Sequence, residues 1–200
     1  MDFATQEKGL TELFGPLFQK IEKLLSSKER VCVALDGRCC AGKTTLASYL
    51  ERSWPCIAVH MDHFFLPPEL RTKERLDIPG GNVHCERFLK EVSPNLKIRG
   101  GFSYRAYDCR TGSYHEIQMP DAPLIIVEGS YSHHPRLCEA YDLKVFLTLS
   151  KEAQWERLAG RESAEKLPRF QSEWLPMEEL YFSELRIPER ADFVFDTARP

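Results

Sequence analysis

Residues 37–45 read Gly37-Arg38-Cys39-Cys40-Ala41-Gly42-Lys43-Thr44-Thr45, which matches the pattern G-x-x-x-x-G-K-[ST] of a phosphate-binding loop (P-loop). The apolar run 31–35 before the motif is strand-like, and residues 46–50 after it continue at helical spacing. A strand, a glycine-rich loop and a helix N-terminus in this order place backbone N–H groups and a favourable helix dipole around an anion. We therefore expect all nine residues of the loop to bind the phosphates of a nucleoside triphosphate.

Two side chains of the motif carry chemistry of their own. Lys43 is expected to reach the β- and γ-phosphates, where it is a candidate catalytic residue. The Thr44 hydroxyl is a candidate ligand of Mg²⁺. The motif therefore predicts two cofactors, ATP and Mg²⁺.

Length and composition limit the class of protein. The 200 residues, 42% of them hydrophobic, suit one globular domain over 1–200. The formal net charge of −3 lacks the basic excess of a general nucleic-acid binder, and no apolar run approaches the roughly 18 residues of a membrane span. The N-terminus is mixed and charged, unlike a signal peptide. We expect a cytoplasmic protein whose partner is a small molecule rather than nucleic acid or membrane; a homo-oligomer stays open.

The cysteines favour reduced thiols. There are seven, an odd number without a C-x-x-C pair, which argues against a disulfide framework and a zinc site. Because Cys39 and Cys40 are adjacent, their side chains are expected to diverge rather than to converge on one ion. Their position near a helix N-terminus and Lys43 favours the thiolate.

Apolar runs and helical patterns alternate along the chain. After the run at 31–35, four more apolar runs read as strands buried on both faces: 56–59, 124–127, 143–149 and 191–195. Helical patterns occupy 10–25, 86–92, 151–161 and 177–185. The alternation predicts an α/β fold of the P-loop NTPase type, with a mostly parallel five-stranded sheet flanked by helices.

Two further segments stand apart from this alternation. The N-terminal segment 1–28 carries one apolar stripe, which predicts an amphipathic helix in which Pro16 either introduces a kink or starts the main segment. Residues 97–119 are aromatic and partly alternating around a polar turn, which predicts an inserted β-hairpin.

Two carboxylates follow apolar strands. Asp62 comes after the second core strand and Glu128 after the third, so both are expected at the carboxyl edge of the sheet, where the P-loop lies. Asp62 there can take a proton from an acceptor hydroxyl, or alternatively cap the next segment or bind Mg²⁺ indirectly. Glu128 can hold Mg²⁺, commonly through water, or be an ordinary strand-end carboxylate.

Arginines gather after the fourth core strand. Arg157 and Arg161 are four residues apart and share a helical face, and Arg169 follows after Pro168. Cations on a mobile lid over 151–176 could neutralise the charge that develops on a transferring phosphate. The alternative is a solvated helix whose arginines pair with Glu156, Glu162 and Glu165.

These motifs together resemble the uridine kinase family of P-loop kinases, with phosphoribulokinase and pantothenate kinase as more distant relatives. The resemblance rests on the P-loop, the segments 62–65 and 127–129, the Arg157/Arg161 region and the stretch 79–88, and covers, with gaps, about residues 30 to 197. It implies that Asp62 activates the nucleoside 5′-hydroxyl and that the aromatic hairpin forms a wall beside the base. The residues expected to contact the acceptor are Phe65, His84, Tyr104, Tyr107 and Arg169.

The sequence departs from this family at one position. Relatives usually carry an acid after Pro-Gly-Gly-Asn that binds the ribose hydroxyls, and our alignment places His84 there, with Asp77 nearby as a substitute. A neutral imidazole accepts one hydrogen bond, whereas a carboxylate can accept from two hydroxyls. The sequence thus indicates an ATP-dependent kinase with uridine or cytidine as leading acceptor. The alternatives are a kinase for another hydroxyl-bearing metabolite or vitamin precursor, and a non-catalytic ATP-binding regulatory module.

Overall fold

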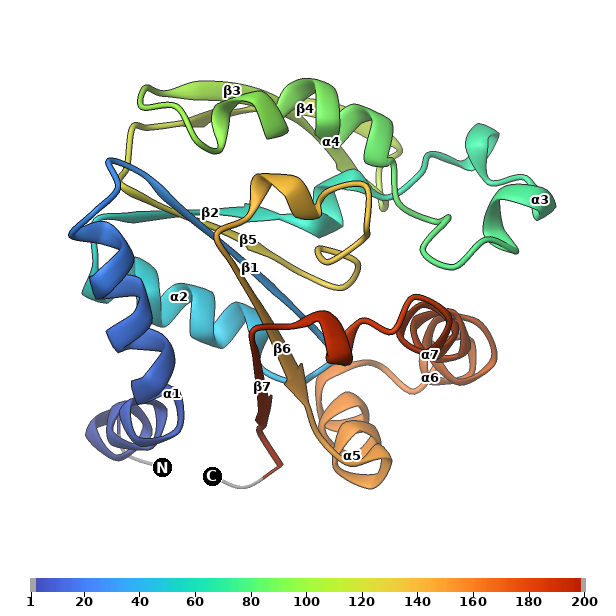
Figure 1. Ribbon diagram of the computed structural model, residues 1–200. Coiled ribbons are helices and arrows are strands. Elements are labelled where there is room, and N and C mark those ends of the chain that lie inside the picture. Colours follow the sequence, from blue (N-terminus) through green and yellow to red (C-terminus); the bar gives the residue numbers. More distant parts are fainter. Residues whose placement is uncertain (1–2, 199–200) are drawn as a thin grey trace.

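The computed structural model describes residues 3–198 and contains a five-stranded parallel sheet (Figure 1). Its strands stand in the order β2-β5-β1-β6-β7, and every neighbouring pair is parallel. The strands are β1 Val31–Gly37, β2 Cys56–His60, β5 Leu124–Glu128, β6 Leu143–Thr148 and β7 Phe193–Asp196. This arrangement confirms the predicted α/β fold with a parallel five-stranded sheet.

Helices cover both faces of the sheet. They are α1 Phe3–Leu25, α2 Lys43–Ser53, α3 Lys73–Leu76, α4 Cys85–Glu91, α5 Lys151–Arg161, α6 Leu167–Arg169 and α7 Leu175–Glu184. In Figure 1, α1 and α2 lie on one side of the sheet, and α4 with the hairpin β3–β4 lies on the other. The buried side chains form two hydrophobic clusters. One includes Leu17 of α1 and Leu46 of α2, and the other includes Phe88 of α4 and Tyr181 of α7. No helix within residues 3–198 is both long and apolar enough to cross a membrane.

The N-terminal helix continues through its proline. α1 runs from Phe3 to Leu25 with Pro16 inside it, so Pro16 does not start the main segment. Leu17 and Ile21 are fully buried against the sheet. The apolar stripe of α1 is therefore used for packing in the core.

The hairpin lies between α4 and β5. Its strands, β3 Phe102–Asp108 and β4 Ser113–Met119, are antiparallel, with Tyr104 opposite Ile117. They form a sheet of their own rather than extending the parallel one. The predicted inserted hairpin is confirmed, and its strands begin a few residues later than the segment 97–119 suggested.

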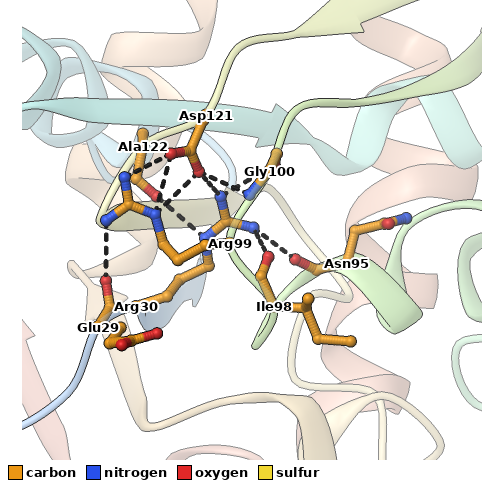
Figure 2. Close-up of polar contacts among 8 residues, drawn as sticks. All are labelled: Glu29, Arg30, Asn95, Ile98, Arg99, Gly100, Asp121 and Ala122. Atoms are coloured by element: carbon orange, nitrogen blue, oxygen red, sulfur yellow. Dashed lines mark hydrogen bonds and ion pairs between the residues drawn. The ribbon is translucent and has the colours of Figure 1, made fainter.

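A buried arginine fastens the base of this hairpin to the start of β1 (Figure 2). The Arg30 side chain is fully buried and pairs with Asp121, which also binds Arg99. The Arg30 guanidinium further donates to four backbone carbonyls, those of Asn95, Ile98, Gly100 and Ala122. Since these carbonyls precede and follow the hairpin, Arg30 fixes both of its ends with charge-assisted hydrogen bonds.

Candidate active site

The P-loop joins β1 to α2 at the carboxyl edge of the sheet. Gly37 has a φ of +138°, and a Cβ there would lie 2.0 Å from the carbonyl oxygen of Leu147, so only glycine fits. The Lys43 ammonium donates to the carbonyl oxygens of Gly37, at 2.6 Å, and Arg38, at 2.9 Å. The Lys43 side chain thus folds back onto the P-loop, where it is predicted to bind the β- and γ-phosphates.

Thr44 and Glu128 meet at the same edge. The Thr44 hydroxyl donates to Glu128 Oε2 over 3.3 Å, and His60 Nδ1 lies 2.6 Å from Glu128 Oε1. His60 and Glu128 are partners in the β2–β5 register, which places them side by side. The hydrogen bond to Glu128 raises the pKa of His60, against the opposing effect of burial.

This donor set fits a nucleotide-bound Mg²⁺. Hydroxyl and carboxylate oxygens are the ligands that Mg²⁺ prefers, and one or two of them suffice when phosphates supply the rest. A cage of three or more His, Cys, Asp or Glu side chains is absent from the described part of the chain. Thr44 and Glu128 therefore suit a metal that arrives with the phosphates rather than a metal held by the protein alone.

Asp62 lies directly after β2, in a short 3₁₀ helix, Met61–Phe64. This helix packs closely on Gly129, whose φ is +132° and where a Cβ would lie 2.8 Å from Met61 Cβ. Asp62 is exposed at the protein surface, but many protein atoms surround its carboxyl. This partial loss of hydration, followed by the negative charge of Glu128, raises the pKa of Asp62. A carboxylate with a raised pKa at this edge can act as a general base.

Two of the three predicted lid arginines contact the P-loop. Arg157 donates to the carbonyl oxygen of Cys40 at 3.3 Å and to that of Thr197 at 2.5 Å. Arg161 donates to Cys39 Sγ at 3.3 Å and also pairs with Glu162. Both therefore lie beside the P-loop. Arg161 also makes one of the contacts with acidic residues expected of a solvated helix.

The third predicted arginine lies elsewhere. Arg169 is at the end of α6 and pairs with Glu173 at 2.9 Å. Its guanidinium also lies over the ring of Trp174, 4.8 Å from the ring centroid. Its predicted contact with the acceptor would need a movement of this segment.

His84 lies beside the segment that carries Asp62. Its backbone N–H donates to the carbonyl oxygen of Phe64 at 2.7 Å, and Phe65 forms an antiparallel bridge with Val83. Burial and the charge of Arg87 lower the pKa of His84, so its ring is neutral at pH 7. The alternative ribose-binding acid, Asp77, is exposed directly after the short helix α3 and forms an ion pair with Lys73.

The two predicted hairpin tyrosines are almost fully buried. Tyr104 is 2% exposed and Tyr107 3% exposed. The Tyr104 hydroxyl lies 2.9 Å from His63 Nδ1, and burial, with neighbouring positive charge, lowers the pKa of His63 to about 4. In this arrangement the hairpin presents the hydroxyl of Tyr104 to the neutral His63 ring, rather than an open ring face. Phe65 is half-buried and its ring lies 6.3 Å from that of Tyr131.

Two buried acids near the P-loop were not identified from the sequence. Asp36, fully buried in β1, accepts from the backbone N–H of Gly37 and from three further donors; these are Tyr131 N, His133 N and Tyr181 Oη. Glu178 on α7 accepts from the Cys39 N–H at 3.0 Å and from Ser130 Oγ at 2.7 Å. Asp36 could have been identified, because it is a charged residue at the end of the apolar run that forms β1. Glu178 gave no such local signal, since it is 139 positions from Cys39.

The side chains of Cys39 and Cys40 converge, contrary to the prediction. Their Sγ atoms are 3.8 Å apart. Neighbouring side chains point apart in regular structure, but Cys40 has a φ of +63°, in the left-handed region, and the turn brings the sulfurs together. All seven cysteines lie within the described residues and are free thiols.

Solved structures share this fold. A protein from Bacillus stearothermophilus described as a possible uridine kinase superposes with a TM-score of 0.65 at 21% identity, covering 90% of this chain and 100% of its own. The D-glycerate 3-kinase of Cryptococcus neoformans var. grubii superposes with a TM-score of 0.61 at 14% identity, covering 96% of this chain and 97% of its own. No protein-family model matches the chain, and no curated protein matches its sequence. The likeness confirms the predicted P-loop kinase fold, and with it the resemblance to uridine kinase-like proteins at the level of the fold.

Proposed function

We propose that this protein is an ATP-dependent kinase that phosphorylates a hydroxyl group of a small molecule, with the 5′-hydroxyl of uridine or cytidine as the leading acceptor. One observation carries the proposal. Asp62, just after β2, lies at the same carboxyl edge of the sheet as the P-loop and the hydrogen-bonded pair Thr44–Glu128. The charges of Glu128, Lys43 and Arg161 act on its carboxyl. A base, a phosphate cradle and a pair of Mg²⁺-type oxygen donors are the parts that phosphoryl transfer to an alcohol requires.

In this proposal each residue has a distinct task. Backbone N–H groups of the loop and the Lys43 ammonium bind the β- and γ-phosphates. Thr44 and Glu128 would hold Mg²⁺, which neutralises phosphate charge when bound. Asp62 accepts the proton of the acceptor hydroxyl and orients its oxygen, while Arg157 and Arg161 offset the charge that develops on the transferred group.

Observations on the acceptor point in two directions. The resemblance to uridine kinases favours it, and His84 lies beside the Asp62 segment, where an acceptor would be held. The neutral ring of His84 and the buried faces of Tyr104 and Tyr107 favour a different hydroxyl-bearing metabolite or vitamin precursor. Joint presence of Lys43, Asp62 and Glu128 favours catalysis over a non-catalytic ATP-binding module.

A coupled assay of ADP release tests the proposal. The purified protein is supplied with Mg²⁺-ATP and a panel of nucleosides, sugars and vitamin precursors, and the Lys43→Ala variant provides the background of contaminating kinases. We expect one class of acceptor to raise ADP release well above this background. ATP binding without acceptor-dependent turnover across the panel would favour the regulatory module instead.

A further inference from the structure

The two cysteines of the P-loop form a close pair. Their Sγ atoms are 3.8 Å apart, within hydrogen-bond range for sulfur, and both side chains are partly open to solvent. A left-handed conformation at Cys40 holds this geometry, which adjacent residues in regular structure do not have. The pair also lies a few residues before the first residue of α2, Lys43, inside the loop that would bind the phosphates.

The surroundings of the pair favour a thiolate on one sulfur only. The pKa of Cys39 is lowered to about 7, first because the Cys40 thiol donates a hydrogen bond to its sulfur, with Arg161 and Lys43 adding positive charge. Arg161 Nη2 lies 3.3 Å from Cys39 Sγ. Cys40 keeps its proton, since its hydrogen bond to Cys39, then burial and the charge of Cys39, all raise its pKa. This is the arrangement of a nucleophilic thiolate beside a resolving thiol.

We propose that Cys39 and Cys40 form a redox-sensitive dithiol that a peroxide converts reversibly into a disulfide within the P-loop. The Cys39 thiolate attacks one peroxide oxygen and the O–O bond breaks, so that Cys39 becomes a sulfenic acid. The departing hydroxide takes up the proton that the Cys39 thiol released on ionising and becomes water. The Cys40 sulfur then attacks Cys39 Sγ, forming the S–S bond and releasing water. In sum, two thiols and one hydrogen peroxide give one disulfide and two waters.

The disulfide would change the loop that binds phosphate. Cα atoms of adjacent residues are about 3.8 Å apart, less than the usual 4.4–6.8 Å of a disulfide, so this ring is strained and easily reduced again. Closing it draws the sulfurs together and displaces Cys39, whose N–H and carbonyl are held by Glu178 and Gln154. We therefore expect oxidation to block nucleotide binding, a consequence that rests on the proposed function.

Mass spectrometry tests the chemistry directly. The reduced protein is treated with hydrogen peroxide at pH 7.4, quenched with N-ethylmaleimide and digested with trypsin, which releases residues 39–43 with both cysteines and no other. We expect this peptide to lose two hydrogens, to escape alkylation and to recover with dithiothreitol. In the Cys40→Ser variant, dimedone should instead trap a sulfenic acid on Cys39.

Cys109 is the internal control for the rate. It is exposed on the hairpin, and desolvation raises its pKa, so little of it is ionised at pH 7.4. The larger thiolate fraction of Cys39, partly offset by its lower nucleophilicity, predicts roughly tenfold faster oxidation. Equal rates at Cys39 and Cys109, or a Cys39 sulfinic acid beside a free Cys40, would overturn the proposal.

A fluorescent ATP analogue separates the two proposals. The reduced protein should bind the analogue, the oxidised protein should bind it at least tenfold more weakly, and dithiothreitol should restore binding. Unchanged affinity of the fully oxidised protein would overturn the claim that the disulfide blocks the site. If the reduced protein binds no nucleotide, the proposed function fails, while the mass measurement still decides whether the pair is a redox-active dithiol.

Discussion

The Thr44 hydroxyl donates a hydrogen bond to Glu128 over 3.3 Å, although the two residues are 84 positions apart in the chain. The sheet explains the meeting. β1 and β5 are parallel neighbours, with Leu35 opposite Glu128, and α2 starts just beyond the end of β1. The strand order therefore brings together a hydroxyl and a carboxylate, both suited to Mg²⁺.

Lys43→Ala should weaken nucleotide binding without unfolding the protein. The ammonium has no core contact to lose and, in this structure, bonds only to loop carbonyls among the contacts described. A charged hydrogen bond contributes about 1.5–3 kcal/mol, so we expect affinity for Mg²⁺-ATP to fall by roughly 10- to 100-fold. Nucleotide titration with circular dichroism measures both properties. Lys20→Ala, on the exposed face of α1, is the control, and normal ATP affinity in folded Lys43→Ala would defeat the P-loop assignment.

Arg157→Gln and Arg161→Gln should each lower kcat more than they raise the KM for the acceptor. Both arginines contact the P-loop, so they are placed to act on charge that develops during transfer. Loss of such a group typically costs roughly 10²-fold or more in kcat. Steady-state kinetics decides this, with Arg110→Gln in the exposed hairpin turn as control. An unchanged kcat in both variants would leave the arginines a structural role only.

Arg169→Gln should act differently from these two. Its ion pair with Glu173 keeps it away from the P-loop in this structure, so an effect requires the segment to move over the acceptor. We expect the KM for the acceptor to rise by a few-fold with little change in kcat. Unchanged kinetics would remove Arg169 from the acceptor site.

His84→Asp should raise kcat/KM for uridine or cytidine by roughly tenfold or more, if His84 stands where relatives have their ribose-binding acid. One recovered charged hydrogen bond is worth about 1.5–3 kcal/mol. The assay belongs at pH 7.5 or above, where the lowered pKa of His84 keeps the native ring neutral. His84→Asn is the matched control, because it has the shape of Asp without the charge. The control matters because Glu86 Oε2 lies 3.3 Å from His84 Nδ1 and would repel a new carboxylate.

The comparison with deoxyuridine completes this test. The native protein should discriminate weakly between uridine and deoxyuridine, because a neutral ring holds ribose hydroxyls less strongly than a carboxylate. Strong rejection of deoxyuridine by the native protein, together with no gain in His84→Asp, would show that the alignment is wrong. Asp77 or another group would then hold the ribose.

Arg30→Met should destabilise the fold. The variant keeps much of the buried volume but removes the guanidinium that donates to the backbone carbonyls at both ends of the hairpin, while Asp121 keeps its pair with Arg99 (Figure 2). Leaving a buried acceptor without its donor typically costs about 1–3 kcal/mol, which urea unfolding can measure. Arg99→Met, whose side chain shares Asp121 but is exposed, should have a much smaller effect. Equal effects of the two substitutions would contradict the anchoring role of Arg30.

Most of the fold could be predicted from local patterns in the sequence. Continuous apolar runs marked the strands because both faces of the sheet are buried, and the motif G-x-x-x-x-G-K-[ST] marked the P-loop between β1 and α2. The carboxyl-edge rule then placed Asp62 and Glu128 on the side of the P-loop without any coordinates.

Other features depend on conformation or on distant contacts. The converging sulfurs of Cys39 and Cys40 follow from one left-handed residue, which the sequence does not mark because cysteine rarely adopts it. Glu178 reaches the P-loop from α7 only after the chain has folded. Burial of Tyr104 likewise depends on how the hairpin packs against Phe64, at a ring distance of 5.4 Å.

The most direct test of the central claim is to measure phosphorylated acceptor by mass spectrometry with native protein and with Asp62→Asn. The amide retains the shape of the carboxyl but cannot take the proton of the acceptor hydroxyl. If Asp62 is the base, Asp62→Asn should bind Mg²⁺-ATP with native affinity and form product with a kcat roughly 10²–10⁴-fold lower. Product formation by Asp62→Asn at a near-native kcat would contradict the account and return Asp62 to a structural role.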